Sequence, residues 1–217
     1  MSLVLYTFWR SQAAYRVRIG LHLKGLRAEP VVVNLMAGEQ HAPEYRRLNP
    51  AMALPTLLDG DGPPLIESLA ILEYLDETHP EPPLLPRDPR LRAHARAVAQ
   101  MVAADAHPLI VPRVRHYLER EMGLDEAART KWLRHWLDTA AQAVEELLAD
   151  DPRTGRFCVG DAPTIADICL FAHVTSAKML YDFDLTRYPT VARICAACEA
   201  LEAFSVTHPL RQPDGPG

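Results

Sequence analysis

The chain has 217 residues, is 48% hydrophobic and 24% charged, and carries a formal net charge of −5 from 23 basic and 28 acidic side chains. This length is sufficient for one or two domains with buried cores. The acidic balance disfavours a nucleic-acid-binding protein, which normally has a basic stripe or half. No apolar run is long enough to span a bilayer, and the N-terminus lacks the charge order of a signal peptide, so we expect a cytosolic protein without a membrane span.

Proline is in surplus and glycine in deficit. The chain holds 19 prolines and 10 glycines, whereas an average chain has about 5% proline and 7% glycine. No low-complexity tract collects these prolines, so we expect them at turns, helix ends and special peptide bonds of folded structure.

The first 80 residues alternate strand and helix signals. Apolar and β-branched runs predict strands, and amphipathic stretches between them predict helices. The valine run at 31–33 is typical of a buried strand. The expected strands are 2–8, 29–35, 56–59 and 64–66, and the expected helices are 13–24, 43–48 and 68–78. This order predicts an α/β domain over residues 1–80 with a mixed four-stranded sheet.

A proline-rich segment follows this domain. Residues 79–89, HPEPPLLPRDP, contain five prolines in eleven positions, which predicts a stiff interdomain linker over 81–89. Strand signals then stop. Helical patterns over 90–121, 125–149, 164–178 and 189–204, the first interrupted by Pro108 and Pro112, predict that residues 90–217 form an all-α domain.

One helix start in this second region has a specific signature. Thr164 and Asp167 form a capping box, in which the threonine oxygen accepts from a first-turn amide and the aspartate reaches back. The helix that follows is apolar nearly all round, so we expect it to be buried and Asp167 to be structural rather than catalytic.

The four cysteines are too few for a disulfide scaffold and are expected to be free thiols. Cys195 and Cys198 form a C-x-x-C, but it lies inside a helical pattern without a second pair or a histidine cluster. This context favours buried helix-face cysteines, and we expect no metal site.

Three segments of the first domain carry polar groups suited to one ligand. Ser11 lies between the first strand and the first helix, where it either caps the helix or donates to an anion at its positive end. Leu54-Pro55 is a candidate cis bond that would expose the Leu54 backbone to an extended peptide. Ser68 opens a helix whose first amides suit a carboxylate, and Glu67 suits an ammonium group. Glutathione carries a carboxylate and an amine at one end and a thiol further along, so it would satisfy all three segments.

Nearly the whole chain resembles the zeta-class glutathione transferases, a group that includes maleylacetoacetate and maleylpyruvate isomerases. The segments that carry the resemblance are FWRS at 8–11, YRVRI at 15–19, LNP at 48–50, LPTL at 54–57, ESLAI at 67–71, VGD at 159–161 before the capping box, and HPLRQPD at 208–214. The resemblance implies a thioredoxin-like domain followed by an α-helical domain that forms the pocket for the electrophilic substrate. It also implies glutathione as cofactor, a small cis-enoic diketo acid as substrate, and a homodimer.

The resemblance also implies roles for particular residues. Ser11 would hold the glutathione sulfur as a thiolate, and Leu54, Pro55, Glu67 and Ser68 would bind the rest of glutathione.

Two histidines, His41 and His107, match positions that contact the end groups of glutathione, although either is equally consistent with a surface or interface residue. Arg10, beside Ser11, is the candidate anchor for a substrate carboxylate, because its planar fork suits bidentate pairing.

Further cations are candidates for the same substrate, but their assignment is less direct. Arg16 and Lys178 are predicted to contribute to substrate binding. Arg16 is also consistent with a helix-face residue paired with acidic neighbours, and this is the preferred interpretation of Arg18. Met179 stands where the family usually places an arginine that faces the substrate.

The segment after Ser11 also departs from the family pattern, because Gln12 and Ala13 replace a second serine and a cysteine. Three functions stay open at this point. The chain is an isomerase of maleylpyruvate or maleylacetoacetate, a zeta-like transferase or α-haloacid dehalogenase of another specificity, or a non-catalytic binding module.

A stripe of small residues in the first long helical pattern bears on the oligomeric state. The stripe consists of Leu91, Ala95, Ala99, Val102, Ala103 and Ala106 at helical spacing. Small residues permit a close helix approach, as in a dimer interface, although a helix contact within the chain explains the stripe equally well.

Overall fold

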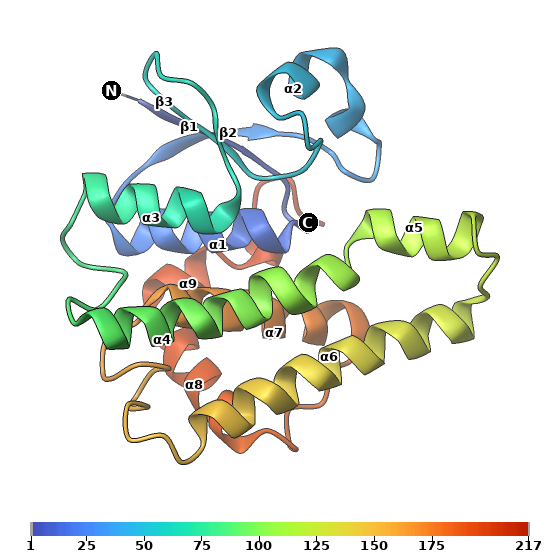
Figure 1. The fold of residues 1–217 in the computed structure, drawn as a ribbon. Helices are drawn as coiled ribbons and strands as arrows, with labels where there is room; N and C mark the ends of the chain where they lie inside the picture. The colour runs from blue at the N-terminus through green and yellow to red at the C-terminus, as the bar shows by residue number, and fades with distance from the viewer. Residues whose placement is uncertain (1, 217) are drawn as a thin grey trace. The chain divides into compact units, whose positions relative to one another are not determined.

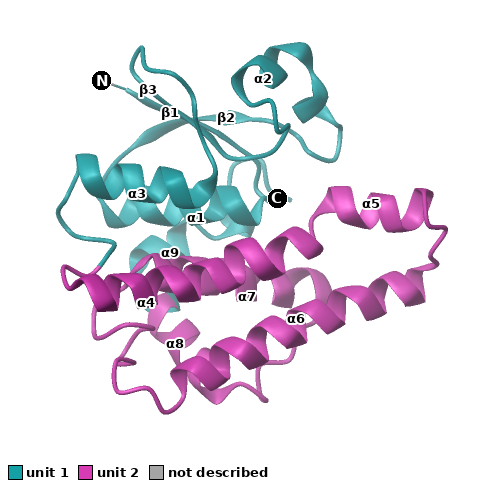
Figure 2. Cartoon of the chain, viewed as in Figure 1, with its two compact units in different colours: residues 1–85, 199–217 teal, residues 86–198 magenta. Residues whose placement is uncertain are grey.

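The computed structural model describes residues 2–216, and the chain folds into two compact units (Figure 2). Unit 1 comprises residues 1–85 and 199–217, and unit 2 comprises residues 86–198. The boundary after residue 85 falls inside the proline-rich segment. Residues 199–217, which the sequence pattern assigns to the helical domain, group with unit 1, where the Tyr15 hydroxyl donates to the Phe204 carbonyl oxygen (3.0 Å).

Unit 1 contains the predicted mixed sheet. Its strands are β1 (Leu3–Thr7), β2 (Ala28–Val32), β3 (Thr56–Asp59) and β4 (Leu65–Ile66), arranged in the order β2-β1-β3-β4. β1 runs parallel to β2 and antiparallel to β3, and β3 runs antiparallel to β4. The sheet is therefore parallel on one side of β1 and antiparallel on the other.

The expectation that the 31–33 valine run forms a buried strand is wrong. β2 is an edge strand that pairs only with β1, and its last residue, Val32, is 47% exposed. Pro30 lies within β2, and a residue without an N–H is tolerated at an edge because one side of the strand has no partner. Val33 is buried but lies beyond the end of the strand.

The helices of unit 1 are α1 (Gln12–Leu23), α2 (Pro43–Leu48), α3 (Ser68–Thr78) and α9 (Glu202–Val206), with short 3₁₀ helices at Glu39–His41 and Pro209–Arg211. Figure 1 shows α1 and α3 side by side on one face of the sheet. Leu5, Val17, Leu57 and Ile71 belong to the core between them and the sheet. At Gly20 a Cβ atom would lie 2.2 Å from Leu72 Cδ2, so the close contact requires glycine.

Unit 2 is all-helical, as predicted. Its helices are α4 (Pro89–Gln100), α5 (Pro112–Arg120), α6 (Glu126–Leu148), α7 (Ile165–Tyr181) and α8 (Pro189–Glu199). The helical pattern after α4 continues as a π-helical turn at Met101–Ala106 and a 3₁₀ turn at His107–Leu109. Pro108 is the second residue of this 3₁₀ turn and Pro112 the first of α5, where their missing N–H groups leave no internal bond unmade.

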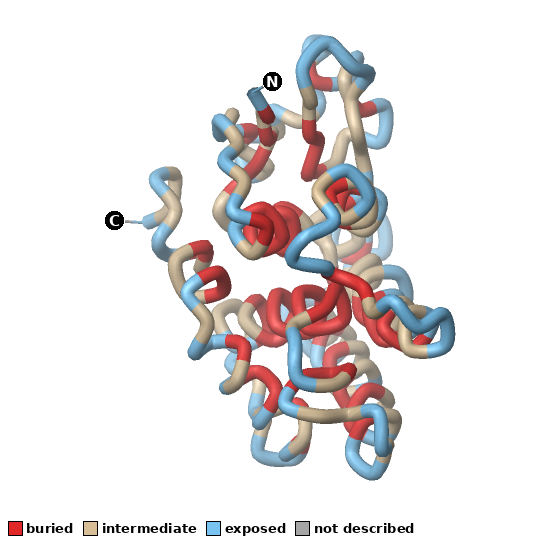
Figure 3. Tube along the Cα trace, turned by 90° about the vertical axis from the view of Figure 1, so that its left-hand side faces the viewer, coloured by how far each residue is buried: buried red, intermediate tan, exposed pale blue. Residues whose placement is uncertain are grey.

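Most of the small-residue stripe, which runs through α4 and the π-helical turn after it, is buried within unit 2. Ala95, Ala99 and Ala106 are buried, and α4 packs against α7. The close helix approach that the stripe permits is therefore used inside the chain. Figure 3 shows that buried residues line the interior of both units, whereas the connecting loops are mostly exposed.

The capping box at the start of α7 is confirmed. The Thr164 side chain accepts from the Ala166 N–H, and the Asp167 carboxylate accepts from the Thr164 N–H (2.8 Å) and hydroxyl (2.9 Å) and from the Cys158 N–H (2.7 Å). Burial raises the pKa of Asp167, and these donors act in the opposite direction. Asp167 therefore ties the loop before α7 to the helix, in agreement with its predicted structural role.

All four cysteines are buried free thiols, as the sequence predicts. Burial raises the pKa values of Cys158 and Cys198, because an apolar environment disfavours a thiolate. Within residues 2–216 there is no group of three or more His, Cys, Asp or Glu residues placed to hold a metal ion. Among the described helices, none has the length and apolarity needed to cross a membrane.

Asp167→Asn provides a test of the capping network. Asparagine presents one acceptor oxygen to three donors, so at least one buried donor loses its partner. We expect a loss of about 2–4 kcal/mol in the free energy of unfolding, which corresponds to a fall of about 4–16 °C in the midpoint of thermal unfolding for a chain of this size.

Circular dichroism at 222 nm measures this midpoint. Asp150→Asn, at an exposed carboxylate just beyond the end of α6, is the control and is expected to change stability by less than about 0.5 kcal/mol. Equal midpoints for the two variants would contradict a structural role of Asp167.

Candidate functional site

Strand register brings the three predicted ligand-binding segments to one end of the sheet in unit 1. In the pairing of β1 with β3, Tyr6 lies opposite Thr56, and in the pairing of β3 with β4, Thr56 lies opposite Ile66. Ser11 follows the end of β1, Pro55 directly precedes β3, and Glu67 directly follows β4. These segments are far apart in sequence and neighbours in the sheet.

Ser11 is the N-cap of α1. Its backbone is extended (φ −73°, ψ 108°), and its Oγ accepts from the Ala14 N–H at 3.2 Å. The side chain is largely buried, with the residue 8% exposed. Capping uses the oxygen as an acceptor, and a hydroxyl still has its O–H to donate to a second partner. The structural and functional interpretations of Ser11 are therefore compatible.

A tight turn carries Arg10 and Ser11. The Ser11 N–H donates to the Phe8 carbonyl oxygen at 2.9 Å, so Trp9 and Arg10 are the two central residues of the turn. The Arg10 guanidinium lies 5.6 Å from the centre of the Trp9 ring, and its Nη1 is 3.7 Å from Met36 Sδ. Among the described residues of unit 1, no acidic side chain forms an ion pair with Arg10, so its charge is available for an anion.

Arg18 secures this turn, a role that the sequence interpretation did not include. Its guanidinium donates to the Thr7 hydroxyl (2.8 Å) and to the carbonyl oxygens of Phe8 (3.3 Å) and Trp9 (3.4 Å). The prediction that Arg18 pairs with acidic residues on a helix face is therefore incomplete, because its hydrogen bonds are to neutral oxygens. Its position in the second turn of the helix that follows the FWRS segment is the sequence signal for such a role.

The peptide bond between Leu54 and Pro55 is cis, as predicted. The carbonyl oxygen of Ala53, just before it, accepts from Tyr45 Oη (2.5 Å) and from Asn49 Nδ2 (2.8 Å). Burial raises the pKa of Tyr45, and its hydrogen bonds with Thr56 and Asn49 act in the opposite direction. Tyr45 and Asn49 thus fix the path of the chain into Pro55, a role that the LNP segment at 48–50 did not by itself predict.

Glu67 adopts a strained backbone conformation directly before α3. Its φ of 68° lies in a region that non-glycine residues rarely occupy. It occupies the N-cap position, but its side chain does not cap the helix, and the first turn of α3 contains no acidic residue. Strain of this kind is frequent at ligand-binding positions. The N-terminal end of α3 therefore keeps its partial positive charge for an external anion.

Arg16 lies behind the start of α3. Its Nη1 donates to the Ser68 Oγ at 3.1 Å, and the two residues are 2% and 4% exposed. The predicted direct contact of Arg16 with substrate does not agree with this burial. The Arg16 guanidinium is instead placed against the Ser68 hydroxyl at the start of α3.

The remaining predicted residues come from other segments of the chain than these strand ends. His41 is exposed in the 3₁₀ helix Glu39–His41, with its Nδ1 3.5 Å from Met52 Sδ. His107 starts the 3₁₀ turn of unit 2, and Lys178 is exposed in the last turn of α7, next to the half-buried Met179. His107 and Lys178 belong to unit 2, so the geometry of unit 1 does not include them.

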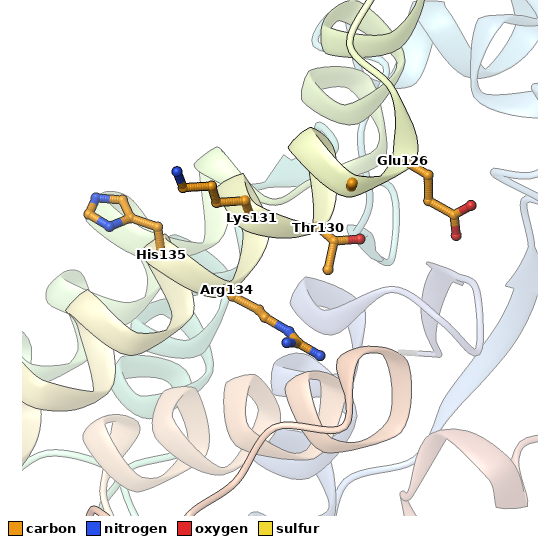
Figure 4. Close-up of a pocket in the computed structure, with 6 residues that line it drawn as sticks. Glu126, Thr130, Lys131, Arg134 and His135 are labelled. Atoms are coloured by element: carbon orange, nitrogen blue, oxygen red, sulfur yellow. The ribbon is translucent and has the colours of Figure 1, made fainter.

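A surface hollow on α6 does not involve any predicted residue. Its lining comes from a single helix and consists of Glu126, Ala127, Thr130, Lys131, Arg134 and His135 (Figure 4). The labelled side chains diverge along the helix rather than converge on a common point. We therefore place the candidate site at the sheet edge of unit 1.

Comparison with known proteins adds independent findings. Residues 5–83 match the family model described as glutathione S-transferase, N-terminal domain, and residues 124–197 match that of the C-terminal domain. The chain is 44% identical to a probable maleylacetoacetate isomerase of Vibrio cholerae over 99% of both chains.

Two solved structures are similar to the chain over nearly their whole length. One is a maleylacetoacetate isomerase of Methylobacterium extorquens with bound malonate and glutathione, with a TM-score of 0.95 and 48% identity over 98% of this chain and 99% of that one. The other is a holo maleylpyruvate isomerase, a bacterial zeta-class glutathione S-transferase, with a TM-score of 0.93 and 42% identity over the same shares. The chain therefore belongs to the glutathione S-transferase family, within its zeta class.

Proposed function

We propose that this protein is a glutathione-dependent cis–trans isomerase of a maleylpyruvate- or maleylacetoacetate-type diketo acid. The observation that carries the proposal is the position of the Ser11 hydroxyl at the start of α1, at the same sheet edge as Leu54-Pro55 and Glu67-Ser68. Relatives that match over nearly the full chain bear the names of both isomerases, which supports this reaction over the dehalogenase and binding-module alternatives.

The donor set at the sheet edge fits glutathione. The first amides of α3 and the Ser68 hydroxyl suit the γ-glutamyl carboxylate, because they lie at a positive helix end whose first turn contains no acidic residue. The Glu67 carboxylate suits the adjacent ammonium group. The backbone of Leu54, beside the cis bond to Pro55, suits the extended peptide part.

Ser11 is the proposed catalytic residue. When bound, glutathione supplies a thiolate that adds reversibly to the cis double bond of the substrate, so that rotation about a single bond precedes elimination. A free cysteine thiol has a pKa of about 8.5, and each unit of depression represents about 1.4 kcal/mol of thiolate stabilisation. The Ser11 O–H and the N-terminal end of α1 both favour the anion.

The substrate needs cationic anchors more than a strong general base, because its carboxylates must stay bound while the double bond turns. Arg10 is the proposed anchor in unit 1, since it precedes Ser11 and its planar fork suits a carboxylate. Lys178 is the proposed second anchor, from unit 2. His41 and His107 are proposed to contact the end groups of glutathione.

Arg16 is proposed as a positioning residue rather than a substrate ligand. Its bond to Ser68 fixes the hydroxyl that faces the glutathione carboxylate, and its charge adds to the positive end of α3. Both effects strengthen binding of an anion without direct contact with it.

Ser11 provides a test of the reaction itself. Ser11→Ala removes the O–H donor to the sulfur, so we expect kcat to fall about 10²–10³-fold, the usual effect of removing one donor to a reacting anion. The assay follows the ultraviolet absorbance of maleylpyruvate with and without glutathione.

Ser11→Thr keeps a hydroxyl and the helix cap and is the matched control, with partial activity expected. If the parent protein shows no glutathione-dependent conversion, the isomerase proposal fails. Turnover of dichloroacetate in its place would favour the dehalogenase alternative, and absence of retention on immobilised glutathione would favour a binding module.

A second prediction concerns Arg16. Arg16→Lys keeps the positive charge but loses the fork that reaches Ser68, and Arg16→Met removes the charge as well. We expect the dissociation constant of glutathione, measured by isothermal titration calorimetry, to rise about 3–10-fold in the lysine variant and more in the methionine variant. A 3–10-fold rise corresponds to about 0.7–1.4 kcal/mol, which is the net contribution of a typical hydrogen bond. Unchanged affinity in both variants would rule out this role.

The oligomeric state and the cellular location of the protein are also part of the proposal. We propose a homodimer, as the zeta-class resemblance implies, and a cytosolic location, in which a reducing environment keeps the four buried thiols free. Multi-angle light scattering is expected to give a mass of twice 24.2 kDa. A single-chain mass at micromolar concentration would overturn the homodimer.

A further inference from the structure

We propose that Asp214, near the C-terminus, is a positioning residue for the turn that carries Arg10 and Ser11. The inference rests on the proposed function, in which Ser11 holds the glutathione sulfur. It identifies a contribution to the site from a segment more than 200 positions away in sequence.

The direct contact is a hydrogen bond to the turn backbone. The Trp9 N–H donates to the Asp214 Oδ2 at 2.8 Å. Trp9 follows Phe8, whose carbonyl oxygen closes the turn by accepting from the Ser11 N–H. Because Trp9 is a central residue of that turn, the carboxylate holds a backbone N–H that the turn itself does not use. A bond of this kind, to an ionised acceptor, is roughly twice as strong as one between neutral groups.

Arg18 holds the same turn by donating to the carbonyl groups of the turn. Its guanidinium donates to the carbonyl oxygens of Phe8 and Trp9, so the turn is bound by an anion at one N–H and by a cation at two C=O groups. Burial lowers the pKa of Arg18 to about 10, and the charges of Tyr15 and Asp214 act in the opposite direction. Asp214 therefore also favours the charged state of Arg18, whose guanidinium holds the turn.

The C-terminal segment that carries Asp214 is itself anchored on α1. The Tyr15 hydroxyl donates to the Phe204 carbonyl oxygen, and the Tyr15 ring meets the His208 ring edge-on at 6.3 Å. Beyond His208, Gln212 Nε2 donates to the His208 carbonyl oxygen (3.1 Å), and the Gly215 N–H donates to that of Gln212 (2.9 Å). These bonds hold residues 204–215 in a defined path that ends at the turn.

The proposed hydrogen bond from the Ser11 O–H to the glutathione sulfur acts over a short range, so a change in its alignment affects catalysis. A displacement of about 1 Å in a reacting group can lower a rate about 10²-fold. Without Asp214, the Trp9 N–H has lost its acceptor and Arg18 its nearby anion, so the turn relaxes and the Ser11 O–H no longer stays aligned with the sulfur. We expect poorer thiolate stabilisation rather than loss of the fold.

The experiment compares Asp214→Ala, Asp214→Asn and the parent protein. Alanine removes both the acceptor and the charge, whereas asparagine keeps an acceptor oxygen for the Trp9 N–H and removes only the charge. We expect kcat to fall about 10–100-fold in Asp214→Ala and less in Asp214→Asn. The pKa of bound glutathione, measured from thiolate absorbance near 240 nm across a pH titration, is expected to rise in the same order.

Leu210→Ala is the matched control in the same segment. Leu210 is half exposed, and the bond that its backbone N–H donates to His208 Nδ1 does not depend on its side chain. We expect the parental kcat and thiol pKa in this variant. The midpoint of thermal unfolding, measured for every variant, separates an effect on the site from a loss of folded protein.

Two results would overturn the proposal. One is a parental thiol pKa and kcat in Asp214→Ala, and the other is a kcat that falls only in proportion to the folded fraction. If the parent protein lacks isomerase activity, amide hydrogen exchange at Trp9 and the titration of bound glutathione still test the role of Asp214. Faster exchange at Trp9 with an unchanged thiol pKa would show a purely structural contact.

Discussion

The pairing of β3 with both β1 and β4 is the constraint on which the candidate site depends. Because Thr56 lies opposite Tyr6 on one side and Ile66 on the other, the end of β1, the start of β3 and the end of β4 meet at one sheet edge. A shift of one residue in either pairing would turn side chains to the opposite face of the sheet. The buried residues Leu5 and Leu57 face each other in this register, so the core that stabilises the sheet also aligns the site.

Helix α1 extends this alignment to the polar groups. Arg16 bonds Ser68 at the start of α3, and Arg18 bonds the turn that leads into α1 itself. Each arginine thus supports a helix N-terminus that carries a serine, and neither is exposed enough to be a simple surface charge. Buried cations behind two positive helix ends are costly without anions nearby. This electrostatic arrangement supports the proposal that the sheet edge binds a ligand with a thiolate and a carboxylate.

Unit 2 illustrates a different use of a buried charge. Asp167 has its donors within its own unit, so its carboxylate orders the start of α7 and is fully used by the fold. The Ser11 hydroxyl and the uncapped start of α3 in unit 1 keep capacity for an external partner. In this chain a structural residue such as Asp167 has its polar partners within the fold, whereas the proposed functional residues keep capacity for an external partner. The two kinds of residue look alike in sequence.

Sequence alone determined the features that depend on local patterns: the βαβαββα order, the capping box, the cis candidate at Pro55, the all-helical second region and the residues of the family resemblance. It did not predict the exposed edge position of β2, because a valine run has the same composition in a central strand and at an edge. Tertiary structure decided three contacts: the burial of Arg16 against Ser68, the hydrogen bonds of Arg18 to the turn and the contact of Asp214 with Trp9. The Arg16 and Asp214 contacts join residues 52 and 205 positions apart, and such a separation carries no information about distance in space, because strand pairing and helix packing set that distance.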